Sequence, residues 1–121
     1  MRHPKNTGFI WQQPEPPYEL ITLQQARAYR DYGGFILKNA FSKAEVEQLL
    51  SELDPIEADV NAHLATRPKD RPSIARADEI VFSAHVVLRS AIAKTFARHP
   101  TLVKLCHDLI GPRSRLYWDQ L

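Results

Sequence analysis

The sequence predicts a mostly α-helical piece of an α+β domain. Four segments carry apolar residues at helical spacing and are bounded by capping residues, prolines or glycines. The last segment, residues 114–121, is apolar and aromatic and has the composition of a β-strand. A strand needs a sheet to join, and little else in the chain can supply one. We therefore expect the chain as a whole to be the N-terminal part of a larger domain.

The composition is that of an ordinary globular chain. Of 121 residues, 44% are hydrophobic and 25% are charged. Sixteen Lys and Arg residues against fourteen Asp and Glu leave a net charge of +2. This excess is small and the basic residues are dispersed, so we expect no nucleic acid partner. The single cysteine, Cys106, excludes an internal disulfide framework. It fits a reducing compartment, and we expect no disulfide-linked partner.

No targeting signal is visible in the sequence. The N-terminus has no apolar segment of the kind found in signal peptides, and no apolar run approaches the roughly 20 residues that a membrane helix needs. We therefore expect a cytoplasmic protein without a membrane partner.

Residues 1–21 are expected to form an extended, proline-rich arm. Four of the nine prolines lie there and exclude a regular helix. Phe9, Ile10, Trp11 and Tyr18 are too apolar for a purely disordered tail. We therefore expect the arm to lie along the surface of the domain, with a mobile tail as the alternative.

The first helix is predicted over residues 22–32. Thr22 is a good N-cap, and Gln25 three residues later completes a capping box. Gly33 and the glycine after it are expected to end the helix in a left-handed turn. Phe35–Lys38 then predicts a short strand, because four β-prone residues lie between turn formers.

The second helix is predicted from Ser42 to about Ala65. Ser42 and Glu45 form another capping box, and the apolar residues that follow make one stripe at helical spacing. Pro55 interrupts this pattern. We expect Asp54 and Pro55 to be the cap and the first position of a continuing helix.

The next segment is predicted to be a polar, exposed loop over residues 66–77. A short extended piece, Glu79–Phe82, is expected after it. Ser83 is the candidate N-cap of a third helix that ends near His99.

A fourth helix is predicted between Pro100, which suits a first turn, and Gly111, which stops it. Cys106 lies on its wide apolar face. We expect a buried, inert thiol there, because no electropositive neighbour is evident that would favour a thiolate.

The histidines do not predict a metal site in this chain. An iron site built from two histidines and one carboxylate usually starts with His-x-Asp or His-x-Glu. None of the five histidines has an acidic residue two positions later. His107 and Asp108 are adjacent, so on a helix their side chains diverge by about 100°. We interpret all five as surface or packing residues: His3, His63, His85, His99 and His107.

The final segment carries the residues of most interest. Alternation places three residues on each of its faces: Leu116, Trp118 and Gln120 on one, and Tyr117, Asp119 and Leu121 on the other. If Trp118 and Gln120 point inward, they line a polar cavity, because a buried amide needs hydrogen-bond partners. The alternative is an ordinary strand with Gln120 facing solvent.

The order of the elements resembles that of a known family. A helix, a Gly-Phe strand and a helix that starts at Ser-x-x-Glu correspond to Thr22–Tyr32, Gly34–Lys38 and Ser42–Glu45. A helix that begins His-Pro and ends before Gly-Pro, followed by Tyr-x-Asp-Gln, corresponds to the stretch ARHPTLVKLCHDLIGPRSRLYWDQL. Together with VFSAHVVLRS, these segments resemble the N-terminal portion of the phytanoyl-CoA dioxygenase family. The resemblance covers about residues 22–121.

The resemblance implies an iron(II)- and 2-oxoglutarate-dependent oxygenase that hydroxylates a small organic substrate. Its fold is a double-stranded β-helix, or jelly-roll, of which this chain would hold the N-terminal helices and first strands. Gln120 matches a 2-oxoglutarate contact of some members, and Trp118 would face the substrate. The family's iron ligands and its basic 2-oxoglutarate contact are absent from the chain. The resemblance therefore implies a piece truncated before the metal-binding motif, inactive alone and without tight binding of either cofactor.

Two alternatives to this function remain open from the sequence. One is a non-catalytic helical binding or scaffold module that shares these elements. The other is a helical domain that binds nucleic acid, which the dispersed basic residues argue against.

Overall fold

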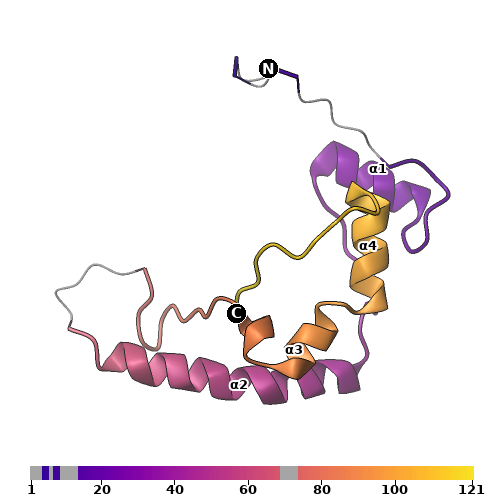
Figure 1. The fold of residues 1–121 in the computed structure, drawn as a ribbon. Coiled ribbons are helices and arrows are strands. Elements are labelled where there is room, and N and C mark those ends of the chain that lie inside the picture. The colour runs from indigo at the N-terminus through magenta and orange to yellow at the C-terminus, as the bar shows by residue number, and fades with distance from the viewer. Residues whose placement is uncertain (1–3, 6, 9–13, 69–73) are drawn as a thin grey trace. The chain divides into compact units, whose positions relative to one another are not determined.

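The computed structural model describes residues 4–5, 7–8, 14–68 and 74–121. These residues are mostly helical, as predicted, and contain no strand (Figure 1). In chain order the elements are α1 (Leu23–Tyr32), α2 (Lys43–Ala65), the 3-10 helix η1 (Val86–Leu88), α3 (Ala91–Phe96) and α4 (Pro100–Ile110). None of the helices in this part of the chain combines the length and the apolar character that a membrane span requires.

The chain divides into two compact units, which are described one at a time. Unit 1 comprises Met1–Phe35 and Lys104–Ser114, and unit 2 comprises Ile36–Val103 and Arg115–Leu121. Unit 1 therefore holds α1 and most of α4, while unit 2 holds α2, η1 and α3.

In unit 1, helix α1 begins and ends as predicted. The Thr22 hydroxyl accepts a hydrogen bond from the Gln25 N–H at 3.2 Å, and the Gln25 side chain accepts one from the Thr22 N–H at 2.9 Å. Gly33 adopts the left-handed conformation, with a φ of 80°, and its N–H donates to the carbonyl of Tyr29. Both ends are thus fixed by contacts within one or two turns of the chain.

A buried carboxylate holds the chain segment before α1. Asp108 is only 7% exposed and accepts the N–H groups of Glu19, Leu20 and Ile21 at 2.8–3.0 Å. Burial by itself raises the pKa of Asp108, but the three N–H donors outweigh it and hold the pKa below its ordinary value. The end of the predicted arm is therefore bound to α4. Three of the arm's apolar residues lie outside the described residues: Phe9, Ile10 and Trp11.

In unit 2, helix α2 confirms the second capping box. The Ser42 hydroxyl accepts from the Glu45 N–H at 3.2 Å, and the Glu45 carboxylate accepts from the Ser42 N–H at 2.7 Å. The expected restart of the helix at Asp54 and Pro55 is wrong, because α2 is continuous through Pro55. Proline removes one backbone donor, which leaves the carbonyl of Ser51 without its helical partner. Both residues are exposed, so water can satisfy that carbonyl.

The predicted third helix is wrong in its first half. Instead of one helix from Ser83, the chain forms η1 and then α3, whose N-cap is Ser90. The Ser90 hydroxyl accepts from the Ala93 N–H at 3.0 Å. The backbone of Ser83 exchanges two hydrogen bonds with Leu121, at 3.0 and 3.2 Å. Because these bonds hold Ser83 in an extended pairing, it cannot start a helix.

The two predicted strands, Phe35–Lys38 and residues 114–121, are not formed. Phe35–Lys38 is an irregular connection that ends in a turn at Lys38 and Asn39. The last segment makes a single antiparallel bridge, between Gln120 and Ala84. A strand takes its backbone hydrogen bonds from a neighbour, and the described residues supply that neighbour only near the end of the chain.

The predicted polar loop lies partly outside the described residues, which omit positions 69–73. Beyond this gap the chain makes a tight turn, closed by two hydrogen bonds between Arg76 and Ile80 at 2.8 and 3.0 Å. Asp78 in this turn has a φ of 60°, and it exchanges two hydrogen bonds with the side chain of Asn61 on α2. The extended piece expected at Glu79–Phe82 is thus reduced to one bridge at Ile80.

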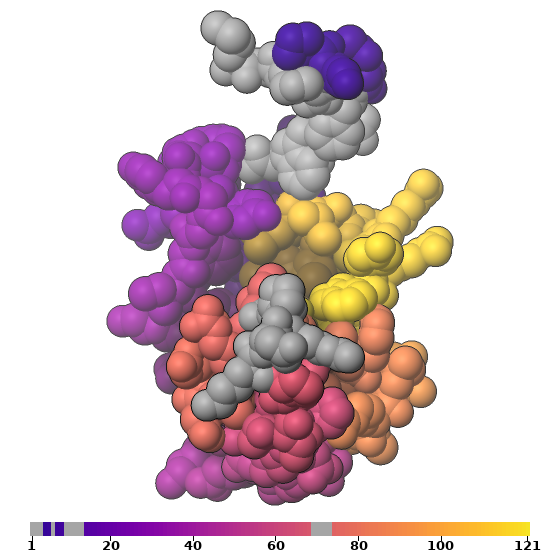
Figure 2. All heavy atoms as spheres, turned by 90° about the vertical axis from the view of Figure 1, so that its left-hand side faces the viewer, coloured from indigo at the N-terminus to yellow at the C-terminus, as the bar shows by residue number. Residues whose placement is uncertain are grey.

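The apolar core of unit 2 is small. Its buried members are Ile56, Val86 and Ala93, and Leu49, Leu53 and Leu121 pack against them half-buried. Figure 2 shows the last residues, in yellow, against the orange segment of η1 and α3. Leu121 thus anchors the end of the chain in this core.

His99 joins the start of α2 to the start of α4. Its Nε2 lies 2.9 Å from a carboxylate oxygen of Glu45, and its Nδ1 accepts the N–H of Thr101 at 3.2 Å. The ring also packs against Phe41 and Phe96, with centroid distances of 5.2 and 5.8 Å. The prediction that His99 is a packing residue is therefore confirmed.

The pKa of Glu45 predicts a loss of stability in acid. Hydrogen bonds from Ser42 and then from His99 lower this pKa from 4.5 to about 2. Because the folded-state pKa is the lower one, the stabilisation is complete above pH 4.5 and is lost as the pH falls toward about 2. Glu45→Gln keeps the capping geometry without a titrating group. We expect it to flatten the pH dependence of the free energy of unfolding across that window, measured by urea unfolding followed by circular dichroism.

The matched control for this measurement is Glu47→Gln in the same helix. Glu47 makes only an exposed ion pair with Lys43, at 3.5 Å. The control should keep the slope of the parent chain. If the Glu45→Gln variant has the same slope as the parent, Glu45 is not the group that causes the loss of stability in acid.

A second prediction concerns Asp108. Asp108→Asn replaces an acceptor of three N–H groups by an amide that can accept at only one atom and adds two donors. We expect a loss of at least about 2 kcal/mol in the free energy of unfolding, because hydrogen bonds to charged groups contribute about 1.5–3 kcal/mol each. Amide hydrogen exchange should accelerate at residues 19–21. Asp31→Asn, an exposed change in α1, should destabilise the chain far less than Asp108→Asn. Unchanged exchange at residues 19–21 in Asp108→Asn would argue against the role of Asp108 in holding this segment.

Candidate functional site

The first candidate site is the face formed by the last residues of unit 2. Backbone pairing with Ser83 and His85 holds Leu121 and Asp119, and the Leu121 side chain packs into the apolar core. The Asp119 carboxylate accepts the N–H of Val87 at 3.0 Å, at the start of η1. The segment is thus fixed by its backbone, by one apolar side chain and by one carboxylate.

Trp118 and Gln120 lie together on this segment, as their alternation predicts. The indole N–H of Trp118 donates to the side-chain oxygen of Gln120 at 3.4 Å. Both side chains are exposed, Trp118 to 53%. The described residues therefore do not enclose them in a polar cavity. Gln120 borders a hollow of about 180 Å³ over the apolar core.

His85 is a third member of this face, which sequence reasoning missed. Its ring meets that of Trp118 edge to face, with a centroid distance of 4.5 Å. Its φ of 58° is uncommon for a residue other than glycine, and such conformations concentrate at functional sites. The N–H of His85, bonded to the Asp119 carbonyl at 3.0 Å, helps to hold it there. Its distance of 33 positions from Trp118 carries no periodic signal that could have revealed the contact.

This face carries polar and aromatic groups but no metal-ligand set among the described residues. It offers an imidazole, an indole and a primary amide, which can stack and form hydrogen bonds. The iron site that the resemblance implies needs two histidines and one carboxylate. Among the described residues, no group of three or more His, Cys, Asp or Glu side chains could hold a metal ion. An iron centre therefore does not fit the residues described.

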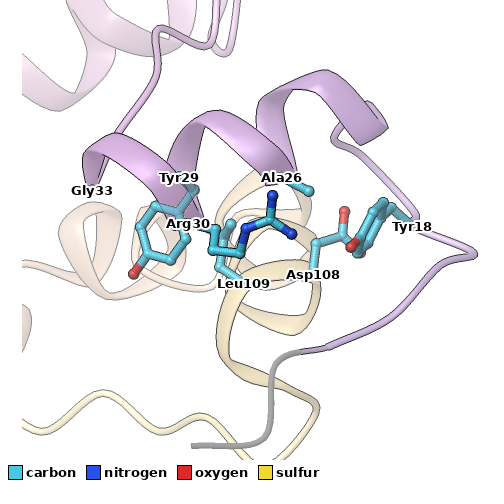
Figure 3. A pocket seen from close by; sticks show the side chains of 7 residues that line it. All are labelled: Tyr18, Ala26, Tyr29, Arg30, Gly33, Asp108 and Leu109. Carbon is cyan, nitrogen blue, oxygen red and sulfur yellow. The ribbon is translucent and has the colours of Figure 1, made fainter.

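The second candidate site is a cavity of about 340 Å³ in unit 1 (Figure 3). Helix α1 contributes one wall and helix α4 another. The cavity is lined by Tyr18, Ala26, Tyr29, Arg30, Gly33, Asp108 and Leu109. Figure 3 shows the Arg30 guanidinium between the ring of Tyr29 and the Asp108 side chain, with Tyr18 beside the carboxylate. The wall is thus partly aromatic and carries one charge of each sign.

The charged groups at this cavity have different surroundings. Arg30 bonds to Asp31 through Nε at 2.8 Å and through Nη2 at 3.4 Å. Those hydrogen bonds raise the pKa of Arg30 and lower the pKa of Asp31. The Tyr18 hydroxyl donates to the carbonyl of Pro14 at 3.2 Å. Asp108, by contrast, is buried and bonded to backbone.

His107, Asp108 and Cys106, the other residues considered from the sequence, do not form a catalytic group with one another. His107 Nδ1 lies 3.8 Å from a carboxylate oxygen of Glu19, and Asp108 accepts the backbone N–H of the same Glu19 at 2.9 Å. Cys106 is half-buried rather than fully buried.

Comparison with known proteins gives no relative: no family model, no curated protein and no solved structure matches this chain. Membership of the phytanoyl-CoA dioxygenase family therefore stays a prediction from the sequence.

A prediction concerns the support of the first face. Asp119→Ala removes the acceptor of the Val87 N–H, and we expect it to cost about 1–2 kcal/mol of the free energy of unfolding. It should also loosen the contact of His85 with Trp118. Fluorescence in a Trp11→Phe background reports Trp118 alone, and its emission should shift toward that of free tryptophan.

The matched control is Asp59→Ala on the exposed side of α2. It should change the free energy of unfolding by less than about 0.5 kcal/mol. It should also leave Trp118 emission as it is. Identical spectra for Asp119→Ala and the control would show that Asp119 does not order the face.

Proposed function

We propose that this chain forms the N-terminal part of an iron(II)- and 2-oxoglutarate-dependent oxygenase of the phytanoyl-CoA dioxygenase family. The proposed reaction is hydroxylation of a small organic substrate on a jelly-roll domain. The observation that supports it is the orientation of the last segment. Leu121 is anchored in the core on one side, while Trp118 and Gln120 share an exposed face on the other.

This orientation gives Gln120 and Trp118 different binding roles. The Gln120 oxygen accepts the Trp118 N–H, so the amide is turned with its own N–H groups free to donate. Amide donors suit a carboxylate, which is the group that 2-oxoglutarate offers. Trp118 supplies a flat apolar surface for a substrate. The described residues thus bind and orient, whereas the oxidative chemistry belongs to the cofactor.

A helical binding or scaffold module is the second candidate function. Its support is the exposure of large apolar side chains in unit 2, with Leu88 at 79% and Leu116 at 58%. Apolar surface of this kind is found where proteins bind one another. In an oxygenase the rest of the jelly-roll would cover such residues, whereas in a binding module a partner protein would cover them.

The reading frame that encodes this chain provides the decisive test. The oxygenase proposal expects an in-frame His-x-Asp motif within roughly 20–40 codons downstream of Leu121, because that motif supplies two of the three iron ligands. The polypeptide translated from the whole frame should form succinate from 2-oxoglutarate. The 121-residue chain alone should form none. A frame without that motif and without turnover would refute the oxygenase and leave the binding module.

In the active polypeptide, Gln120→Ala should raise the KM for 2-oxoglutarate about tenfold, the effect of one lost hydrogen bond of about 1.4 kcal/mol. Gln120→Glu should raise it further, because a carboxylate repels the cosubstrate. The control is Gln48→Ala on the exposed surface of α2, which should leave KM unchanged. Equal KM values in Gln120→Ala and the parent would remove Gln120 from the site.

A further inference from the structure

The cavity of unit 1 presents opposite charges that do not pair with each other. Arg30 and Asp108 both line it. Arg30 bonds to Asp31, and Asp108 bonds to the backbone of residues 19–21. The ion pairs found among the described residues include none between Arg30 and Asp108. Two opposite charges are therefore held apart across one cavity.

Each charged group keeps unused hydrogen-bonding capacity. Arg30 has five N–H groups, and Asp31 engages one on Nε and one on Nη2, which leaves the two on Nη1 and the second one on Nη2. Of the Asp108 oxygens, Oδ2 accepts two N–H groups and Oδ1 accepts one. An ionised carboxylate has about four acceptor positions, so Oδ1 keeps one for a ligand.

The remaining wall suits an apolar or aromatic ligand body. The rings of Tyr18 and Tyr29 lie toward opposite ends of the cavity, with Leu109 between them (Figure 3). Its volume of about 340 Å³ falls in the range of about 300–1,000 Å³ that is typical of small-molecule sites. The Tyr18 ring beside Asp108 also offers an aromatic face to a cation.

We propose that this cavity binds a small zwitterion, an α-amino acid with an apolar or aromatic side chain. Its carboxylate binds at Arg30, its ammonium group at Asp108, and its side chain packs against Leu109 and one of the tyrosine rings. A simple anion is repelled by Asp108 and a simple cation by Arg30. A ligand with both charges gains at both ends. The site shares no residue with the Trp118 face, so it stands or falls separately from the proposed oxygenase.

Three probes of similar size test the proposal on the full chain. L-phenylalanine carries both charges, 3-phenylpropionate lacks the ammonium group, and 2-phenylethylamine lacks the carboxylate. Their dissociation constants are measured by NMR titration, which also reports whether shifts occur at the cavity residues. We expect L-phenylalanine to bind at least about tenfold more tightly than either analogue. Equal affinities for all three, or no binding at millimolar concentrations, would overturn the proposal.

Two variants test the carboxylate end in opposite directions. Arg30→Gln should weaken L-phenylalanine about tenfold, to the level of 2-phenylethylamine, and should not weaken 2-phenylethylamine itself. Asp31→Asn removes the competing carboxylate from Arg30 and should tighten L-phenylalanine several-fold. Both are exposed positions, and circular dichroism checks that each variant is folded. If Arg30→Gln does not fold, Asp31→Asn decides alone.

The control is Arg27→Gln, an exposed change of the same kind in α1 at a residue outside the cavity lining. It should leave all three dissociation constants unchanged. An effect as large as that of Arg30→Gln would show that the ligand responds to the general charge of α1, and the assignment of the site would be wrong.

Discussion

Backbone N–H groups that have no partner in a helix or a sheet must find another acceptor, and this requirement organises both units. In unit 1 one carboxylate, Asp108, satisfies three consecutive N–H groups. In unit 2 Asp119 does the same for Val87, and Ser90 does so for Ala93. These contacts fix much of the local geometry, because buried apolar side chains are few. Among the described residues they are Ile21, Ala26, Ile56, Val86 and Ala93.

The helix ends show where sequence alone is sufficient. The capping boxes at Thr22 and Ser42 and the stop at Gly33 depend on residues within three or four positions, so the pattern predicts them correctly. The third helix fails because Ser83 and Ser90 are equally good caps by composition. What decides between them is the pairing of Ser83 with Leu121, a contact that no local pattern contains.

The same distinction between local patterns and long-range contacts applies to the candidate sites. That Trp118 and Gln120 share a face follows from the alternation of an extended backbone and was predictable without a partner strand. The meeting of His85 with Trp118 and the clamp of Asp108 on residues 19–21 join positions far apart in sequence. Helical spacing places Asp108 on one face of α4, but it cannot say which segment lies opposite. The predicted strands failed for the same reason, because a strand is defined by its neighbour.

In unit 1 the same carboxylate both holds the backbone and lines the cavity, which couples binding to local order. A ligand ammonium group at Oδ1 would share that oxygen with the N–H of Glu19. Such a ligand binds only when Asp108 and residues 19–21 are in place, and it therefore stabilises that arrangement by mass action. In unit 2 the two duties fall on different residues, since Asp119 supports the backbone while Trp118 and Gln120 form the exposed face. A ligand in the cavity therefore contacts the carboxylate that holds the backbone of residues 19–21, whereas a ligand on Trp118 and Gln120 does not contact the carboxylate that holds Val87.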